Sequence, residues 1–255
     1  MMRSLYTAAS GMMAQQMNID NISNNLANVQ STAFKKSRLD FQDLLYSHSQ
    51  APGAEATAGT QIGMGVRSVS SQKLFSTGSL RQTGNNFDVA IQGDGFFSVK
   101  MPDGRVCYTR DGSFKLDGEG NLVTNAGYSI GIKIPKDITN VEISQDGKVT
   151  GIPINGTEPV EIGQIKLTRF LNPAGLKAMG GNLYEWTPVA GQKVEDNPNT
   201  PGMGTLVQGY LEKSNVNVVE EMINIIQAQR AYEINQKSIQ AADEMMRQAN
   251  QLHKG

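Results

Sequence analysis

The chain has 255 residues and an almost balanced charge, with 23 Lys and Arg against 24 Asp and Glu. This balance argues against a general nucleic-acid-binding surface. The single cysteine, Cys107, excludes an internal disulfide framework and a multi-cysteine zinc site, and with two histidines we expect no metal and no cofactor. No apolar run approaches the ~20 residues that span a bilayer, so we expect no membrane insertion.

The first residues resemble a secretory signal only weakly. Arg3 precedes an apolar stretch, but Thr7, Ser10 and Gly11 interrupt it. We therefore expect no cleaved signal peptide. The chain would then stay inside the cell, or leave it by a route that does not read such a segment.

Helix-breaking residues divide the chain into three parts. All nine prolines lie within residues 52–201, and 25 of the 27 glycines lie within residues 53–209. Because the two ends almost lack helix breakers, we predict an α+β protein. Its long N- and C-terminal helices would pack as a coiled-coil-like pair, joined by an extended segment to an antiparallel all-β middle domain. The expected domains are an N-terminal helical arm (1–46), an extended linker (47–72), a β-rich domain (73–209) and a C-terminal helical arm (210–255).

The N-terminal arm carries a heptad-like pattern with very few charges. Residues 1–34 contain only Arg3 and Asp20 as charged residues, and the other helix faces are rich in Asn and Gln. Uncharged amides are buried at a lower desolvation cost than charges. Seven of eight positions at alternating spacings of three and four are apolar, which is typical of a packed seam. The predicted assembly positions of this arm are Leu5, Ala8, Met12, Gln15, Ile19, Ile22, Leu26 and Val29.

The C-terminal arm begins with a helix-start pattern. Asn217 can cap the helix, and Glu220 and Glu221 place negative charge in its first turn. The first turns carry a second apolar row, which predicts contact with more than one neighbour; it consists of Val219, Ile223 and Ile226. The predicted assembly positions of this arm are Val218, Met222, Ile225, Gln229, Tyr232, Gln236, Ile239 and Met246.

One apolar seam per arm does not offset the conformational entropy lost when a whole arm becomes ordered. We therefore expect the arms to order when the protein assembles and to stay mobile in the free subunit. Two alternatives remain open: a helix pair that covers a globular core, and an autonomous coiled-coil binding module.

The middle of the chain alternates short apolar runs with turn sequences. Turns are predicted at residues 102–104, 117–121 and 145–148, each flanked by β-prone residues. The predicted strands are Phe87–Gln92, Phe96–Lys100, Val106–Arg110, Leu122–Thr124, Val141–Ile143 and Ile162–Phe170. Residues 47–62 are expected to be extended or loop-like.

The middle offers little catalytic chemistry. The glycines around Asp94 lack the third glycine and the helix of a dinucleotide site. The spacing of Asp111, Asp117 and Glu119 does not fit a calcium-binding loop, and acids in turns are usually turn formers. Cys107 lies in a β-prone run, which favours a packed small hydrophobe. We expect no catalytic residues; the alternative in a different class is a cell-wall hydrolase that uses acids such as Asp111 or Glu119.

Three blocks of sequence, in order, resemble bacterial flagellar basal-body rod and hook proteins. The first includes Ser10-Gly11-Met12, Asp20-Asn21-Ile22-Ser23-Asn24-Asn25-Leu26-Ala27-Asn28-Val29 and Phe34-Lys35. The second includes Asp88-Val89-Ala90-Ile91, Gly93-Asp94-Gly95-Phe96-Phe97 and Tyr108-Thr109-Arg110-Asp111. The third includes Gly209-Tyr210-Leu211-Glu212, Ser214-Asn215-Val216 and Ala228-Gln229-Arg230-Ala231-Tyr232. The family-motif residues selected from these blocks are Asn24, Asn25, Asn28, Phe34, Ser214, Asn215 and Arg230.

Within that family, the length and residues 172–176 and 181–184 are most similar to distal rod members. The resemblance implies a non-enzymatic subunit that polymerises into a hollow, stiff helical tube, transmits torque from motor to hook and forms the export channel. The implied partners are other copies of the chain, proximal rod proteins, the hook protein, P-ring and L-ring proteins and the flagellar type III export apparatus. The implied location is the basal body across the periplasm. Another rod component or a short hook protein of the same family is the alternative.

The resemblance also singles out one backbone position. Ala33 stands where the family usually has glycine, immediately before the aromatic residue Phe34. If this position requires a positive φ, alanine costs about 1 kcal/mol there.

Overall fold

The computed structural model describes residues 2–49, 60–154 and 158–253. These fall into two compact units. The helical unit comprises residues 1–27, 37–73 and 217–255, and the β unit comprises residues 28–36 and 74–216. The middle of the predicted extended segment 47–62 lies outside the described residues.

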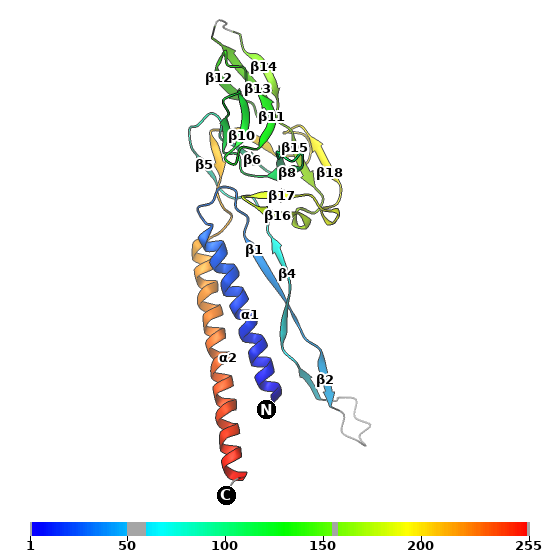
Figure 1. Cartoon of the computed structure of the whole chain (residues 1–255), viewed down its shortest axis with the longest axis vertical. Coiled ribbons are helices and arrows are strands. Elements are labelled where there is room, and N and C mark those ends of the chain that lie inside the picture. Colours follow the sequence, from blue (N-terminus) through cyan, green and yellow to red (C-terminus); the bar gives the residue numbers. More distant parts are fainter. Residues whose placement is uncertain (1, 50–59, 155–157, 254–255) are drawn as a thin grey trace. The chain divides into compact units, whose positions relative to one another are not determined.

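Two long helices at the ends of the chain form most of the helical unit. Helix α1 spans Met2–Ala27 and helix α2 spans Val218–His253, and they lie side by side (Figure 1). The predicted cap is confirmed, because the side-chain oxygen of Asn217 accepts a hydrogen bond from the Val219 amide at 3.1 Å. The predicted terminal helices are therefore present, and their coiled-coil geometry stays a prediction.

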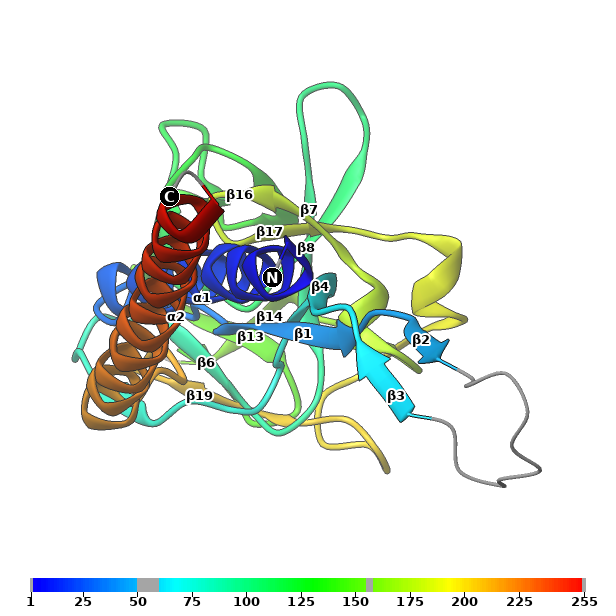
Figure 2. The same ribbon diagram turned by 90° about the horizontal axis from the view of Figure 1, so that it is seen from below.

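The helical unit also contains two pairs of antiparallel strands. Strand β1 (Ser37–Asp43) pairs with β4 (Val66–Lys73), and β2 (Tyr46–Ser49) pairs with β3 (Thr60–Gly63), as Figure 2 shows from below. Side-chain amides of α1 hold the start of β1: Asn21 and Asn25 both donate to the Ser37 carbonyl, at 2.8 and 2.9 Å. Asn25 also accepts from the Ser37 amide at 3.0 Å. Much of the predicted linker is thus paired strand.

The largest sheet of the β unit has nine antiparallel strands in the path β16-β17-β8-β7-β11-β10-β9, with β15 pairing to both β7 and β18. Their bounds are β7 Phe96–Lys100, β8 Val106–Thr109, β9 Phe114–Leu116, β10 Asn121–Thr124, β11 Ser129–Lys133, β15 Leu167–Phe170, β16 Lys177–Gly180, β17 Leu183–Glu185 and β18 Lys193–Asp196. Short 3₁₀ turns cover Pro173–Gly175 and Pro188–Ala190.

Smaller sheets complete the β unit. A three-stranded sheet contains β12 (Ile138–Ile143), β13 (Lys148–Pro153) and β14 (Val160–Gln164). Two antiparallel pairs join β6 (Val89–Gln92) to β19 (Thr205–Gln208) and β5 (Leu80–Gln82) to β20 (Tyr210–Glu212). The three predicted turns lie between β7 and β8, β9 and β10, and β12 and β13, so the antiparallel β middle is confirmed. The one strand predicted over 162–170 is instead two, β14 and β15.

The core of the β unit gathers the apolar faces of several sheets. Its central members include Val89, Phe97, Leu122, Val149 and Leu206, each at most 1% exposed. A second cluster packs aromatic rings edge to face, with Tyr108 and Phe170 at 4.8 Å between centroids. Residues 28–36 and 74–216, which adjoin the two helices in sequence, belong to this unit.

Candidate assembly surface and arm junction

The predicted positions of the N-terminal arm form the less exposed stripe of α1. Ala8 and Ile22 are buried, and Leu5, Met12, Gln15, Ile19 and Leu26 are half-buried. Val29, just beyond the helix in the β unit, is also half-buried. The helices approach closely at Gly11, where a Cβ atom would lie 2.9 Å from the side-chain nitrogen of Asn235 on α2. The stripe is thus largely shielded within a single subunit.

The predicted positions of the C-terminal arm are divided between two faces of α2. Val218, Ile225, Tyr232, Ile239 and Met246 are half-buried, whereas Met222, Gln229 and Gln236 are exposed. The most buried residues of α2 are small or near its start: Ala228 and Ala242 at 3% and Glu221 at 3% exposure. Small side chains allow two helices to approach closely, so the alanines, which the periodicity analysis did not select, mark the covered face of α2.

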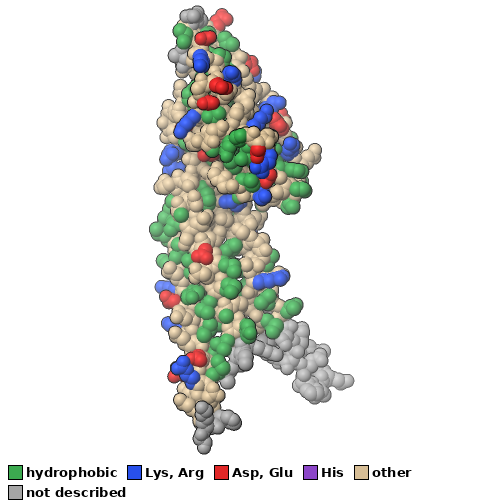
Figure 3. Space-filling view, viewed as in Figure 1, with side chains coloured by type: hydrophobic (Ala, Val, Ile, Leu, Met, Phe, Trp, Pro, Cys, Tyr) green, Lys and Arg blue, Asp and Glu red, His purple; other side chains and the backbone are tan. Residues whose placement is uncertain are grey.

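The helix pair leaves a large amount of apolar side chain in solvent. Val219 is 65% exposed, Ile226 52% and Ile234 64%. Among the described residues, the other exposed large apolar side chains of the two helices are Tyr6, Met13, Met17, Met222, Ile223 and Met245. Figure 3 shows hydrophobic side chains along the helical unit. Exposed apolar surface on this scale typically marks an interaction site. We call these nine residues the helical apolar surface.

A buried charge cluster lies in the β unit where both arms begin. The ammonium group of Lys35 donates to a Glu212 carboxylate oxygen at 2.6 Å and to the Ser76 carbonyl at 2.7 Å. The Arg110 guanidinium lies 3.5 Å from both Glu212 oxygens and donates to the Gly95 carbonyl at 3.0 Å. The side chains of Lys35 and Glu212 are fully buried, and that of Arg110 is 2% exposed. We call Lys35, Arg110 and Glu212 the charge cluster.

Burial and neighbouring charges control protonation in this cluster. Burial lowers the pKa of Lys35 to about 8, against the opposing attraction of Glu212, while Arg110 lowers it further. Burial likewise raises the pKa of Tyr184 to about 12, so its hydroxyl stays neutral. Arg110 also lies 5.4 Å from the centre of the Phe96 ring, a favourable cation–π distance. Both buried cations contact the carboxylate of Glu212.

Asn215 joins three segments of the β unit beside the charge cluster. Its side-chain oxygen accepts from the Lys36 amide at 2.8 Å, and its nitrogen donates to the Leu74 carbonyl at 2.8 Å. Ser214 is buried, and its hydroxyl accepts from the Val216 amide at 3.3 Å. These bonds fix the chain just before it enters α2.

The family-motif residues differ in how far they are buried. Asn25 is buried against β1, and Phe34, Ser214 and Asn215 lie in the β unit, in the segments that contain Lys35 and Glu212. Asn28 is half-buried, whereas Asn24 on α1 and Arg230 on α2 are exposed. Lys35, Arg110 and Glu212 belong to the motif blocks, but each is followed by another charged residue, so no local pattern marks them as buried.

Ala33 adopts a positive φ of 55° and is fully buried, with its amide bonded to the Glu212 carbonyl at 2.8 Å. A left-handed conformation is strained for alanine and free of that strain for glycine. Ala33→Gly is therefore expected to raise the free energy of unfolding by about 0.5–1 kcal/mol, measured by urea denaturation of the full chain. Ala33→Val should lower it, because a β-branched side chain is worse at this φ; the opposite order would contradict the strain at Ala33.

Among the described residues, no helix is long and apolar enough to cross a membrane, and no group of three or more His, Cys, Asp or Glu side chains is placed to hold a metal ion. Asp111 binds Ser113 through its carboxylate, at 2.7 Å to the hydroxyl, which is a turn-forming role. Cys107 is buried.

The chain matches three family models, at its N-terminus, in its middle and at its C-terminus. Residues 5–35 match the flagella basal body rod protein, residues 90–151 the flagellar hook protein FlgE/F/G D1 domain, and residues 207–252 the flagellar basal body rod FlgEFG protein C-terminal region. It is 48% identical to the flagellar basal-body rod protein FlgG of Buchnera aphidicola subsp. Schizaphis graminum, over 99% of this chain and 100% of that protein. The chain belongs to the flagellar rod and hook family.

Other relatives agree with this family assignment. The flagellar basal-body rod protein FlgG of Borreliella burgdorferi is 47% identical over 99% of both chains. The flagellar hook protein FlgE of Helicobacter mustelae is 36% identical over 80% of this chain and 46% of that protein. The solved hook protein FlgE2 of Helicobacter pylori aligns with 62% of this chain and 47% of that chain, at 14% identity and a TM-score of 0.25. As a member of the flagellar rod family, the chain is a structural protein of the flagellum and not an enzyme.

Proposed function

We propose that this chain is the distal rod subunit of the flagellum and that it polymerises into a hollow, stiff helical tube. The tube would transmit torque from motor to hook and form the export channel. Its partners would be further copies, proximal rod proteins, the hook protein, the P-ring and L-ring proteins and the type III export apparatus. The subunit would be exported without a cleaved signal peptide, and the assembled tube would span the periplasm.

The helical apolar surface carries this proposal. A single subunit pairs α1 with α2 yet leaves side chains such as Val219, Ile226 and Ile234 in water. Contacts with other copies would remove this surface from solvent, at about 25 cal/mol per Å² of apolar area. Repeated contacts that do not close on themselves give a helical filament. The exposed positions among the predicted assembly residues, Met222, Gln229 and Gln236 on α2, would extend these contacts.

Ile226→Asp is expected to prevent polymerisation while leaving the subunit folded. Ile226 is 52% exposed, so a carboxylate there is solvated in the monomer, and the free energy of unfolding should change by no more than about 0.5 kcal/mol. In a polymer the same carboxylate would be buried without a partner. Sedimentation of the full chain at rising concentration measures assembly, and circular dichroism measures the fold.

The neighbouring exposed residue Gln227 provides the matched control, since Gln227→Asp adds the same charge to the same turn of α2. A polymer of Ile226→Asp as stable as wild type would contradict the proposed role of the helical apolar surface. The proposed function itself would be contradicted if the wild-type chain formed no polymer either alone or together with other rod proteins.

Another rod component or a short hook protein is the second candidate, and the hook relative supports it. However, this chain aligns with only 46% of the length of the hook relative, whereas it aligns with almost the whole length of the rod relatives. Deleting residues 47–62 separates the candidates. A distal rod subunit should lose straight, stiff rods in electron micrographs, and rods of unchanged stiffness would favour the alternative.

A further inference from the structure

A pocket of about 350 Å³ opens on the β unit, and none of its lining residues belongs to the helical apolar surface. Its aromatic lining includes Phe75, Phe96 and Phe170, with Phe96 at 5.4 and 5.6 Å from the other two ring centres. Leu171, at its rim, is 87% exposed. The edge-to-face rings form a preformed apolar floor that can accept an aliphatic side chain.

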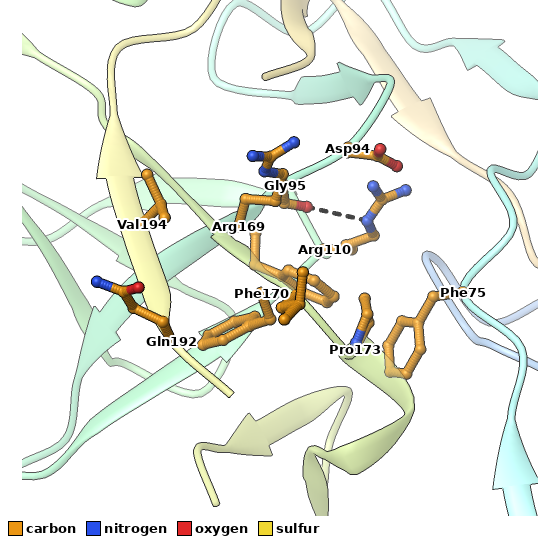
Figure 4. A pocket seen from close by; sticks show the side chains of 11 residues that line it. Phe75, Asp94, Gly95, Arg110, Arg169, Phe170, Pro173, Gln192 and Val194 are labelled. Carbon is orange, nitrogen blue, oxygen red and sulfur yellow. Dashed lines mark hydrogen bonds between the residues drawn. The ribbon is translucent and has the colours of Figure 1, made fainter. Parts of the chain in front are cut away.

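Two guanidinium groups give the pocket an excess of positive charge. Figure 4 shows Arg110 and Arg169 with Asp94, the acidic residue among the lining side chains. Arg110 is already bonded to the Gly95 carbonyl and lies next to Glu212. Arg169 is exposed, and no hydrogen bond or ion pair joins its guanidinium group to another described residue. Arg169 is therefore available to a carboxylate from outside the subunit.

The loop that faces Arg169 is shaped for its side chain. At Gly202, which has φ +87°, a Cβ atom would lie 2.7 Å from a terminal nitrogen of Arg169. Because glycine has no side chain, the guanidinium group has room beside this position. Arg169 is thus held at the rim of the pocket by the surrounding structure.

The same chain carries a complementary feature at another place in the β unit. The turn between β9 and β10 presents exposed Asp117 and Glu119 beside Leu116, which is 41% exposed. The turn is fixed internally, because the Gly118 amide donates to the Asp117 carboxylate at 2.7 Å and the Gly120 amide to the Asp117 carbonyl at 2.9 Å. A preformed turn loses little conformational entropy on binding. Within the described part of the chain, no hydrogen bond or ion pair engages the Glu119 carboxylate.

We propose that the pocket binds the Leu116–Glu119 turn of a second copy of this chain, with Glu119 of that copy facing Arg169. This inference rests on the proposed self-assembly and adds a specific contact between β units. The turn follows β9, at the end of the nine-stranded sheet path, whereas the pocket lies by β15 and β18. Two different surfaces of one unit then meet head to tail, which builds an open filament rather than a closed dimer.

A charge exchange in the full chain tests this contact. Arg169→Glu and Glu119→Arg should each raise the critical concentration for polymerisation roughly three- to fivefold, because like charges would then face each other. The double variant Arg169→Glu with Glu119→Arg should return it close to wild type. Lys193→Glu is the matched control: it changes the net charge equally on β18 but lies outside the pocket lining.

Each result has a separate meaning. Loss in both single variants with recovery in the double variant supports the contact. Wild-type polymerisation of Arg169→Glu, or single losses without recovery in the double variant, overturns it while leaving the proposed function intact. Absence of any wild-type polymer overturns both.

Discussion

Replacing Glu212 with glutamine is expected to lower the free energy of unfolding of the β unit by about 3–5 kcal/mol. The substitution keeps the shape of the side chain but removes the negative charge that Lys35 contacts at 2.6 Å and Arg110 at 3.5 Å. Two buried cations would then lose the counter-charge of Glu212. Urea denaturation followed by tryptophan fluorescence measures the loss, because the single tryptophan, Trp186, lies in the β unit.

Glu142→Gln is the matched control, because Glu142 is exposed on β12 and should change stability by less than about 0.5 kcal/mol. Lys35→Met combined with Glu212→Gln should cost less than the sum of the two single changes, since the charges interact directly. A Glu212→Gln variant within 1 kcal/mol of wild type, on the scale of a single ordinary hydrogen bond, would contradict the role of the charge cluster.

A carboxylate at position 22 is expected to have the second large effect, on the helical unit. Ile22 is 4% exposed in α1, so Ile22→Asp places an unpaired charge in the covered stripe and should cost about 3 kcal/mol or more. Helical circular dichroism at low denaturant should fall, and assembly should be lost. The fluorescence transition of Trp186 should persist, because it reports the β unit.

Ala9→Asp provides the comparison, as Ala9 is exposed on the same helix. It should leave the circular dichroism of the monomer nearly unchanged. Equal helix content in Ile22→Asp and Ala9→Asp would show that the covered stripe of α1 does not hold the helix pair together.

The distribution of proline and glycine was sufficient to predict both terminal helices and the β middle. Local chemistry located the details that are local: Asn217 caps α2, and turns such as 117–121 join adjacent strands. Local patterns could not separate β14 from β15. The break at Ile165 and Lys166 arises because β14 pairs in the three-stranded sheet and β15 pairs in the nine-stranded sheet.

The covered face of α2 and the charge cluster depend on contacts distant in sequence. Apolar periodicity selected Met222, which is 51% exposed, and passed over Ala228, which is 3% exposed. Closely packed helices favour small residues at their interface, and an analysis based on large apolar side chains does not select small residues such as Ala228. Similarly, nothing near Lys35 in sequence identifies Glu212 as its partner. Burial of a charge is decided by the tertiary fold.

The sequence distance within the charge cluster constrains the order in which the protein can fold. Lys35 and Glu212 are 177 residues apart, and β5 and β6 find their partners only in β20 and β19. A chain delivered N-terminus first must therefore wait for nearly its entire length before the β unit can close, and such distant pairings are slow to form. Until then Lys35 remains hydrated and the junction stays open. Closure of the β unit therefore requires the chain as far as Glu212, while α2, residues Val218–His253, still follows.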